Sequence, residues 1–185
     1  MTEHQPFTIT IEDQAISDLN IRLNHSRFSQ QIANEPWTLG TDRDTLISLC
    51  RYWETTFDWR SAERRLNEWP QFVCEIQGEQ LHYAHIRSPH PDATPLVMTH
   101  GWPGSIAEFL DIVGPLTNPV AHGGREHNAF HIVLPSLPGF GFSGPTQRMG
   151  NSPTQMASMI KQLMADLGYS TYVAQGGDWG SIITT

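Results

Sequence analysis

The sequence predicts an α/β fold, in which a mostly parallel, helix-covered sheet follows a mainly helical N-terminal region. Residues 95–99 and 130–134 are short, uncharged, mainly apolar runs, as expected for buried strands. An amphipathic segment over residues 152–168 follows the second run and leads into a third β-prone run, residues 171–174. Strands that alternate with loops and helices are typical of a parallel sheet covered by helices.

Composition bounds the class of protein and its partners. The 185 residues can bury one sizeable core, or a small domain and part of another, and 38% hydrophobic with 16% charged residues is typical of a globular protein. The formal charge of −8 argues against nucleic acid or an anionic membrane surface as a partner. Cys50 and Cys74 are the two cysteines, so no disulfide framework is expected. Since the sequence shows neither a signal peptide nor an apolar run of about 20 residues, we expect a cytoplasmic protein without a membrane partner.

Residues 1–70 are predicted to form the helical N-terminal region. Residues 7–11 alternate like a short strand or extended arm, and a helix opens at Glu12 or Asp13. Residues 34–40 are a predicted loop. The apolar face of the first helix consists of Ile16, Leu19 and Leu23.

A second helix is predicted from Thr41 or Asp42, where Thr41 and Asp44 resemble a capping box. Its apolar stripe is Leu46, Leu49, Cys50 and Trp53. Asp58 is expected to cap a third, short helix that ends near Asn67. The tryptophans of this region are expected to be packing residues; they are Trp37, Trp53, Trp59 and Trp69.

Residues 71–185 are predicted to form the sheet and its covering helices. Residues 72–76 and 81–86 indicate a β-hairpin around Gln77 and Gly78. The hairpin histidines, His82 and His85, are three residues apart and so face opposite sides of a strand, which argues against a metal pair. The loop histidines are a weak metal signal, and no metal site is predicted; they are His122, His127 and His131.

The helix over residues 152–168 has the clearest end signals in the chain. Ser152 is a predicted N-cap, Pro153 occupies the first helical position, and Gly168 ends the helix. Its apolar face consists of Met156, Met159, Ile160, Leu163, Met164 and Leu167.

A β-prone run then leads into Gly176-Gly177-Asp178-Trp179-Gly180, a small-x-nucleophile-x-small pattern. This pattern is typical of a nucleophile elbow, here with Asp178 where a serine hydrolase has serine. A sharp strand-to-helix turn requires small flanking residues and presents the central side chain at a helix N-terminus, where an anion is favoured. A carboxylate in this position is therefore a candidate nucleophile.

A second loop supplies complementary chemistry. His100-Gly101-Trp102-Pro103 follows a predicted strand, at the place where an α/β-hydrolase has the loop that provides one oxyanion-hole donor. The second donor is the residue after the nucleophile, so the predicted donors are the backbone N–H groups of Trp102 and Trp179. Gly101 and Pro103 are expected to shape this loop, and His100 to support it.

Together these motifs resemble the microsomal type of epoxide hydrolase, an α/β-hydrolase-fold family with an extra N-terminal region. The resemblance covers the whole chain. It rests on Tyr52-Trp53, Phe57-Asp-Trp-Arg60, Leu66-Asn67, Trp69-Pro-Gln-Phe72, His100-Gly-Trp-Pro-Gly-Ser105, Leu137-Pro-Gly-Phe-Gly-Phe-Ser143 and the elbow. Residues 1–185 contain no apolar run like the membrane anchor of the microsomal relatives, so we expect a protein similar to their soluble counterparts.

The resemblance implies that Asp178 attacks an epoxide carbon and forms an alkyl-enzyme ester, which water then hydrolyses to a vicinal diol. The oxyanion of that second step is held by the Trp102 and Trp179 amides. An epoxide and water are the implied reactants, and neither a metal nor a cofactor is required. Gly176, Gly177 and Gly180 are the implied loop-shaping residues of the elbow.

The family also uses a general-base histidine, an orienting acid and cap tyrosines, of which the first two follow the nucleophile in sequence. Residues 179–185 contain none of these types. We therefore expect the first half of an α/β-hydrolase sheet, truncated just after the elbow, whose partner is a missing C-terminal half. Two alternatives stay open: a haloalkane dehalogenase-like hydrolase that uses Trp179 to hold halide, and a non-catalytic fragment. A serine esterase is disfavoured because Ser105 and Ser143 lack the flanking pattern.

Overall fold

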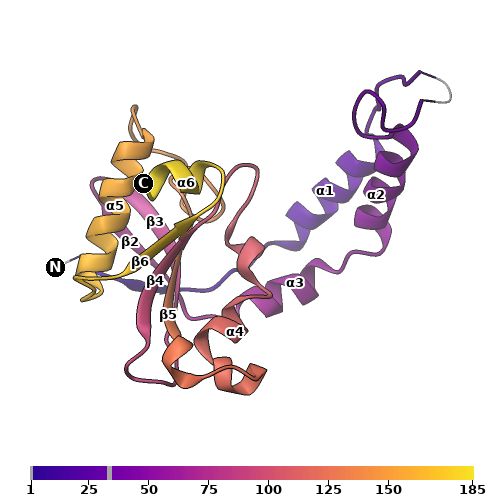
Figure 1. The fold of residues 1–185 in the computed structure, drawn as a ribbon. Helices are drawn as coiled ribbons and strands as arrows, with labels where there is room; N and C mark the ends of the chain where they lie inside the picture. Colours follow the sequence, from indigo (N-terminus) through magenta and orange to yellow (C-terminus); the bar gives the residue numbers. More distant parts are fainter. Residues whose placement is uncertain (1, 33–34) are drawn as a thin grey trace. The chain divides into compact units, whose positions relative to one another are not determined.

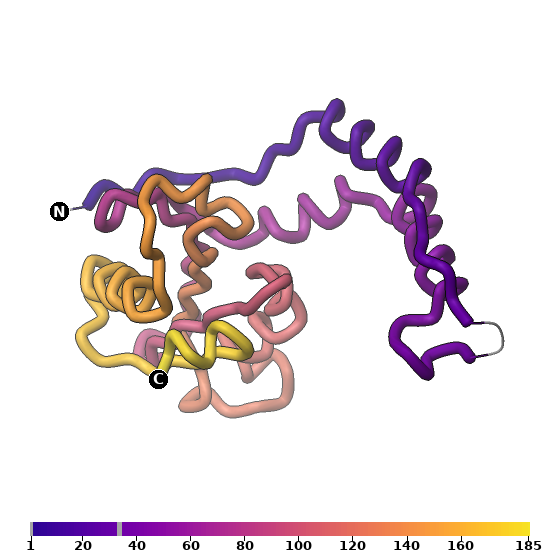
Figure 2. The backbone as a smooth tube through the Cα atoms, turned by 90° about the horizontal axis from the view of Figure 1, so that it is seen from above, coloured from indigo at the N-terminus to yellow at the C-terminus, as the bar shows by residue number. Residues whose placement is uncertain are grey.

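The computed structural model describes residues 2–32 and 35–185, which form two compact units (Figures 1 and 2). Ile9–Arg65 form one unit, and the chain before Ile9 joins Leu66–Thr185 in the other. The unit boundary therefore falls at Leu66, and the first residues belong with the sheet.

One six-stranded sheet organises the larger unit. Its order is β1-β2-β3-β5-β4-β6. The strands are β1 (Gln5–Phe7), β2 (Gln71–Ile76), β3 (Glu79–Ile86), β4 (Thr94–Thr99), β5 (Phe130–Pro135) and β6 (Val173–Gly176).

The expectation of a mostly parallel sheet is wrong for the first part of the sheet. The β1–β2, β2–β3 and β3–β5 pairs are antiparallel, and only the β5–β4 and β4–β6 pairs are parallel. The physical reason lies partly in the connections. Gln77 and Gly78 form a two-residue turn with φ angles of 57° and 80°, and such a turn can join only antiparallel strands. The predicted hairpin is thereby confirmed.

The N-terminal strand lies earlier than predicted. β1 covers Gln5–Phe7, not residues 7–11, and pairs Gln5 with Val73 of β2. The alternation of residues 7–11 does not determine this position, because pairing with a distant strand decides which residues form the ladder.

Two helices cover one face of the sheet around the main core (Figures 1 and 2). α5 (Pro153–Asp166) begins as predicted, because the Ser152 hydroxyl accepts a hydrogen bond from the N–H of Gln155 and Pro153 is the first helical residue. α6 (Trp179–Ile183) packs beside α5 and β6. The fully buried core residues from the strands and α5 are Ile76, Leu81, Tyr83, Val97, Val133, Met159, Leu163 and Met164.

The long connection from β4 to β5 contains several short helical segments. They are the 3-10 segments Ile106–Phe109, Pro119–His122 and Glu126–Asn128, and the helix α4 (Val113–Thr117), which packs against β5. The connection from β5 to β6 instead runs through α5. Both connections are long enough to return the chain for a parallel pairing.

The smaller unit contains α1 (Asp13–Asn24), α2 (Arg43–Thr55) and most of α3 (Trp59–Leu66). α2 starts at one of the two predicted positions, since its N-cap is Asp42, whose carboxylate accepts from the N–H of Thr45 at 2.9 Å. The proposed capping box at Thr41 does not form. Asp58 caps α3 through the N–H of Ser61, as predicted. The predicted loop 34–40 begins at Asn34, outside the described residues, and residues 35–40 contain no helix or strand.

Apolar side chains of the smaller unit remain exposed within this chain. Trp37 is 60% exposed and Trp53 is 45% exposed, so the expectation that they are packing residues is wrong for these two. Trp53 lines an apolar groove of about 560 Å³, which also contains Ile16, Leu49, Tyr52 and Phe57.

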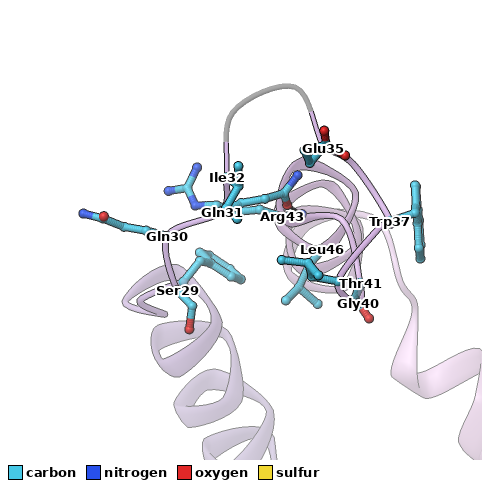
Figure 3. A pocket seen from close by; sticks show the side chains of 12 residues that line it. Ser29, Gln30, Gln31, Ile32, Glu35, Trp37, Gly40, Thr41, Arg43 and Leu46 are labelled. Carbon is cyan, nitrogen blue, oxygen red and sulfur yellow. Dashed lines mark hydrogen bonds between the residues drawn. The ribbon is translucent and has the colours of Figure 1, made fainter.

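A smaller hollow lies between residue 28 and the start of α2 (Figure 3). Gln31 is one of the residues that line it. The Gln31 amide oxygen accepts from the N–H of Arg43, and its amide nitrogen donates to Asp42. These contacts complete the capping of α2 rather than create a reactive site.

Residues 2–32 and 35–185 contain neither a membrane-spanning helix nor a cluster of metal ligands. No helix in this part of the chain has the length and apolar character needed to cross a membrane. Nor do these residues place three or more histidine, cysteine, aspartate or glutamate side chains together as metal ligands.

Candidate active site

The candidate site forms where two neighbouring parallel strands end. β4 and β6 pair with Thr99 opposite Gly176, so both strands reach the same edge of the sheet. The loop that begins at His100 and the turn that contains Asp178 follow directly. Parallel pairing thus brings together the two motifs that the sequence separates.

Asp178 occupies a sharp turn between β6 and α6. Its backbone angles, φ 52° and ψ −123°, lie outside the regions that L-residues favour, and it serves as the N-cap residue of α6. Such conformations persist only where the surrounding structure imposes them. The side chain is exposed at this edge, available to a molecule from solvent.

Gly176 and Gly180 make the turn sterically feasible. A Cβ atom on Gly176 would lie 2.2 Å from the backbone of Gly180, and one on Gly180 would lie 2.1 Å from the carbonyl oxygen of Thr99. A side chain at either position would collide with backbone atoms. Gly177 differs, because a Cβ atom there would meet nothing within 4 Å and its φ is not positive. The structure therefore gives no steric reason for Gly177 to be a loop-shaping residue.

The backbone N–H of Trp102 donates a 2.9 Å hydrogen bond to Oδ1 of Asp178. This bond, together with a smaller contribution from the N–H of Trp179, lowers the pKa of the Asp178 carboxyl below its ordinary value. Both amides predicted as donors therefore act on the same carboxylate. Their indole side chains are largely exposed, 67% for Trp102 and 47% for Trp179.

His100 supports the first loop from within the protein. Its ring is buried, with Nδ1 2.9 Å from the carbonyl oxygen of Gly101 and Nε2 3.1 Å from the backbone nitrogen of Leu137. A carbonyl oxygen can only accept and an N–H can only donate, so Nδ1 carries the proton and Nε2 is the acceptor. Both nitrogens are occupied, which matches the predicted supporting position and leaves no free nitrogen for proton transfer.

Gly101 permits the close approach of the two loops. A Cβ atom on Gly101 would lie 2.5 Å from Cβ of Asp178. Pro103 follows Trp102 through a cis peptide bond. The loop then enters the 3-10 segment Ile106–Phe109.

Sequence reasoning missed a capping box in this loop. Ser105 accepts from the N–H of Ala107, and Glu108 accepts from the N–H of Ser105 at 3.1 Å. The Glu108 carboxylate also fills the space where Gly104 would carry a side chain. The Ser105-x-x-Glu108 spacing was a sufficient signal for this interaction.

The other histidines of the sheet lie elsewhere. His82 contacts Gln71 and Ser136, His85 contacts Tyr169, and His131 accepts from the N–H of Ser88. Ordinary sheet positions, as predicted, thus account for the hairpin histidines. Among the described side chains, no histidine, tyrosine or acid is hydrogen-bonded to Asp178.

A family model described as epoxide hydrolase N terminus matches residues 4–109, more than half of the chain. The chain belongs to this epoxide hydrolase family. A second model, described as alpha/beta hydrolase fold, matches residues 94–185 and therefore includes both loops of the site.

Curated relatives match nearly the whole chain but only part of their own length. Juvenile hormone epoxide hydrolase 1 of Ctenocephalides felis is 38% identical over 97% of this chain and 39% of its own length. Epoxide hydrolase 1 of Sus scrofa is 36% identical over 98% of this chain and 41% of its own length. The epoxide hydrolase family chain described here thus spans about two fifths of these relatives.

Solved structures agree on the fold. The juvenile hormone epoxide hydrolase of Bombyx mori superposes with a TM-score of 0.85 at 32% identity, covering all of this chain and 49% of that one. The Aspergillus niger epoxide hydrolase superposes with a TM-score of 0.84 at 36% identity, covering 98% of this chain and 48% of that one. The α/β-hydrolase fold class predicted from the sequence is confirmed, with the mixed sheet described above.

Proposed function

We propose that this chain carries the nucleophilic half of an epoxide hydrolase, with Asp178 as the nucleophile. The observation that carries the proposal is the 2.9 Å hydrogen bond from the Trp102 N–H to Asp178 Oδ1 at a strained strand-to-helix turn. It places an ionised, exposed carboxylate against fixed backbone donors. The family membership and the relatives named as epoxide hydrolases support the substrate class.

Backbone N–H groups from both loops hold the Asp178 carboxylate. Oδ1 accepts a 2.9 Å hydrogen bond from the N–H of Trp102, and the N–H of Trp179 donates to the same carboxylate. We assign the attack on a carbon of the epoxide to Oδ2, because Oδ1 is engaged with the Trp102 amide. The Oδ2–carbon bond forms, the ring carbon–oxygen bond breaks, and the released alkoxide takes a proton from an acid or water.

The same donors serve the second step. Water attacks Cγ of the ester, and negative charge develops on Oδ1, where the Trp102 and Trp179 amides form the proposed oxyanion hole. Collapse of this intermediate regenerates the carboxylate and releases a vicinal diol. Substrate and water supply every atom, so the scheme needs neither a metal nor a cofactor.

Hydrolysis of the ester requires a base that removes a proton from water. His100 is unsuited because both of its ring nitrogens are hydrogen-bonded inside the protein. We infer that the base comes from a C-terminal portion of the kind that the relatives contain and this chain does not span. The cytoplasmic location likewise stays a prediction.

Mass spectrometry of the 185-residue chain with styrene oxide tests the proposal. The expected result is one substrate molecule attached per chain, located on Asp178 by peptide mapping, with little diol formed. Asp178→Asn should not be labelled, whereas Asp92→Asn, which changes an exposed loop carboxylate, should be labelled like the unmodified chain. Unlabelled Asp178 in a folded chain would refute the assignment, and halide release from a chloroalkane would favour the dehalogenase alternative.

A further inference from the structure

A buried hydrogen-bond network supports the loop that contacts His100. It centres on His82 of β3, which is fully buried, and it includes Ser136, the first residue after β5. Nδ1 of His82 lies 2.9 Å from the hydroxyl oxygen of Ser136, and Nε2 lies 3.0 Å from the amide oxygen of Gln71.

The directions of these bonds follow from Gln71. Its amide nitrogen donates to the carbonyl oxygen of Leu66, so its oxygen faces His82 and accepts from Nε2–H. Nδ1 is then the acceptor and the Ser136 hydroxyl the donor. Burial lowers the pKa of His82 to about 4, so the ring is neutral near pH 7 and keeps this acceptor.

The backbones of the two residues are joined as well. The Ser136 N–H donates to the carbonyl oxygen of His82 at 2.9 Å. Ser143 adds two hydrogen bonds: its hydroxyl donates to the carbonyl oxygen of Ser136 and accepts from the N–H of His82. Residues 136–143 are thereby held to β3 at both ends.

The loop of residues 136–143 also fixes the position of His100. The residue after Ser136 is Leu137, whose N–H donates to Nε2 of His100. His100 in turn donates to the carbonyl oxygen of Gly101, the residue before Trp102. A continuous set of contacts therefore runs from His82 through the loop to the amide that binds Asp178.

We propose that His82 and Ser136 are positioning residues for the Trp102 amide: they hold residues 136–143 so that His100 fixes the loop of the oxyanion hole. Neither residue touches Asp178. The inference rests on the proposed function for its catalytic meaning, but the geometric effect can be measured without catalysis.

Selective ¹⁵N labelling of tryptophan provides that measurement, because both proposed oxyanion donors are among the six tryptophans. His82→Asn and His82→Leu form a matched pair. Both lose the ring and its bond to Gln71, but only asparagine retains an acceptor near Ser136. Ser136→Ala removes the hydroxyl itself. We expect the Trp102 amide signal to shift and its hydrogen exchange to accelerate in His82→Leu and Ser136→Ala, and to stay closer to native in His82→Asn.

Tyr83→Phe is the control for a general loss of stability. Tyr83 is the neighbouring buried residue on β3 and loses one hydrogen bond, to His4, that does not lead to the loops. The Tyr83→Phe variant should therefore leave the Trp102 amide signal unchanged. Asp178→Asn alters the acceptor of the Trp102 N–H and so shows how the signal responds when that hydrogen bond is disturbed.

Ester formation gives the second readout. At saturating styrene oxide, Ser136→Ala should label Asp178 about 10-fold to 10²-fold more slowly, with a nearly unchanged half-saturating concentration. A native Trp102 signal in folded Ser136→Ala and His82→Leu would overturn the positioning proposal. Failure of the native chain to be labelled would instead count against the proposed function, and the amide measurement would still decide this inference.

Discussion

Gly180 and Thr99 approach so closely that a Cβ atom on Gly180 would lie 2.1 Å from the carbonyl oxygen of Thr99. The first turn of α6 therefore rests directly on the end of β4. This contact sets the position of the turn that presents Asp178 beside the loop after β4. Position 180 therefore requires glycine because α6 packs closely against the end of β4, and not only because the chain bends there.

Gly180→Ala should lower the free energy of unfolding of the larger unit by about 1–3 kcal/mol, because the methyl group must displace backbone atoms. Gly177→Ala is the matched control: its Cβ meets nothing within 4 Å, and its effect should stay within about 1 kcal/mol of zero. Urea unfolding followed by near-UV circular dichroism measures both. Equal destabilisation by the two variants would contradict the distinction between these glycines.

Gly101→Ala should impair the site more than the fold. Its Cβ would lie 2.5 Å from Cβ of Asp178, so the Trp102 amide and the carboxylate must move apart. Because the carboxylate is then displaced from its attack geometry, the rate of Asp178 labelling by styrene oxide should fall by about 10²-fold. Quenched-reaction mass spectrometry gives the rate, and Ala107→Gly, an exposed change in the same loop, serves as the control.

Acid should destabilise the larger unit through His82. Burial lowers its pKa from 6.5 to about 4 in the folded protein, so the unfolded chain takes up a proton first as the pH falls. The free energy of unfolding should be highest above pH 6.5 and should decrease between pH 6.5 and 4. The loss from His82 alone is on the order of 3 kcal/mol.

Urea unfolding at a series of pH values measures this decrease, and His82→Asn should make it shallower. His85 also has its pKa lowered to about 4, mainly by burial, and contributes in the same direction. His85→Asn provides the comparison. An unchanged pH dependence in both variants would show that other groups dominate acid unfolding.

Asp42→Ala should destabilise the start of α2, because it removes the acceptor for the N–H of Thr45. The N–H of Thr45 is also the largest cause of the lowered pKa of Asp42. Thr41→Ala is the control and should have little effect. Hydrogen exchange of the first α2 amides distinguishes the two variants. Faster exchange in Thr41→Ala than in Asp42→Ala would contradict the assignment of Asp42 as the N-cap.

Much of the local structure followed from the sequence, for local physical reasons. Ser152 and Pro153 begin α5, Asp58 caps α3, and Gln77-Gly78 forms the hairpin turn. These features depend on backbone sterics and on donors within a few residues. The same holds for the glycine spacing around Asp178, which predicts the strained turn independently of the strand order.

Only the tertiary structure decided which distant groups meet. The sequence pattern left open where β1 pairs, and it wrongly extended parallel pairing to the whole sheet, because strand pairing is set by contacts between segments far apart in the chain. The sequence pattern also did not show that glycine is sterically required at position 180 but not at 177. The difference arises because Gly180 lies against the backbone of Thr99, whereas a Cβ atom on Gly177 would meet nothing within 4 Å. The link from His82 through Ser136 to His100 likewise exists only because β3, β5 and β4 are neighbours in the sheet.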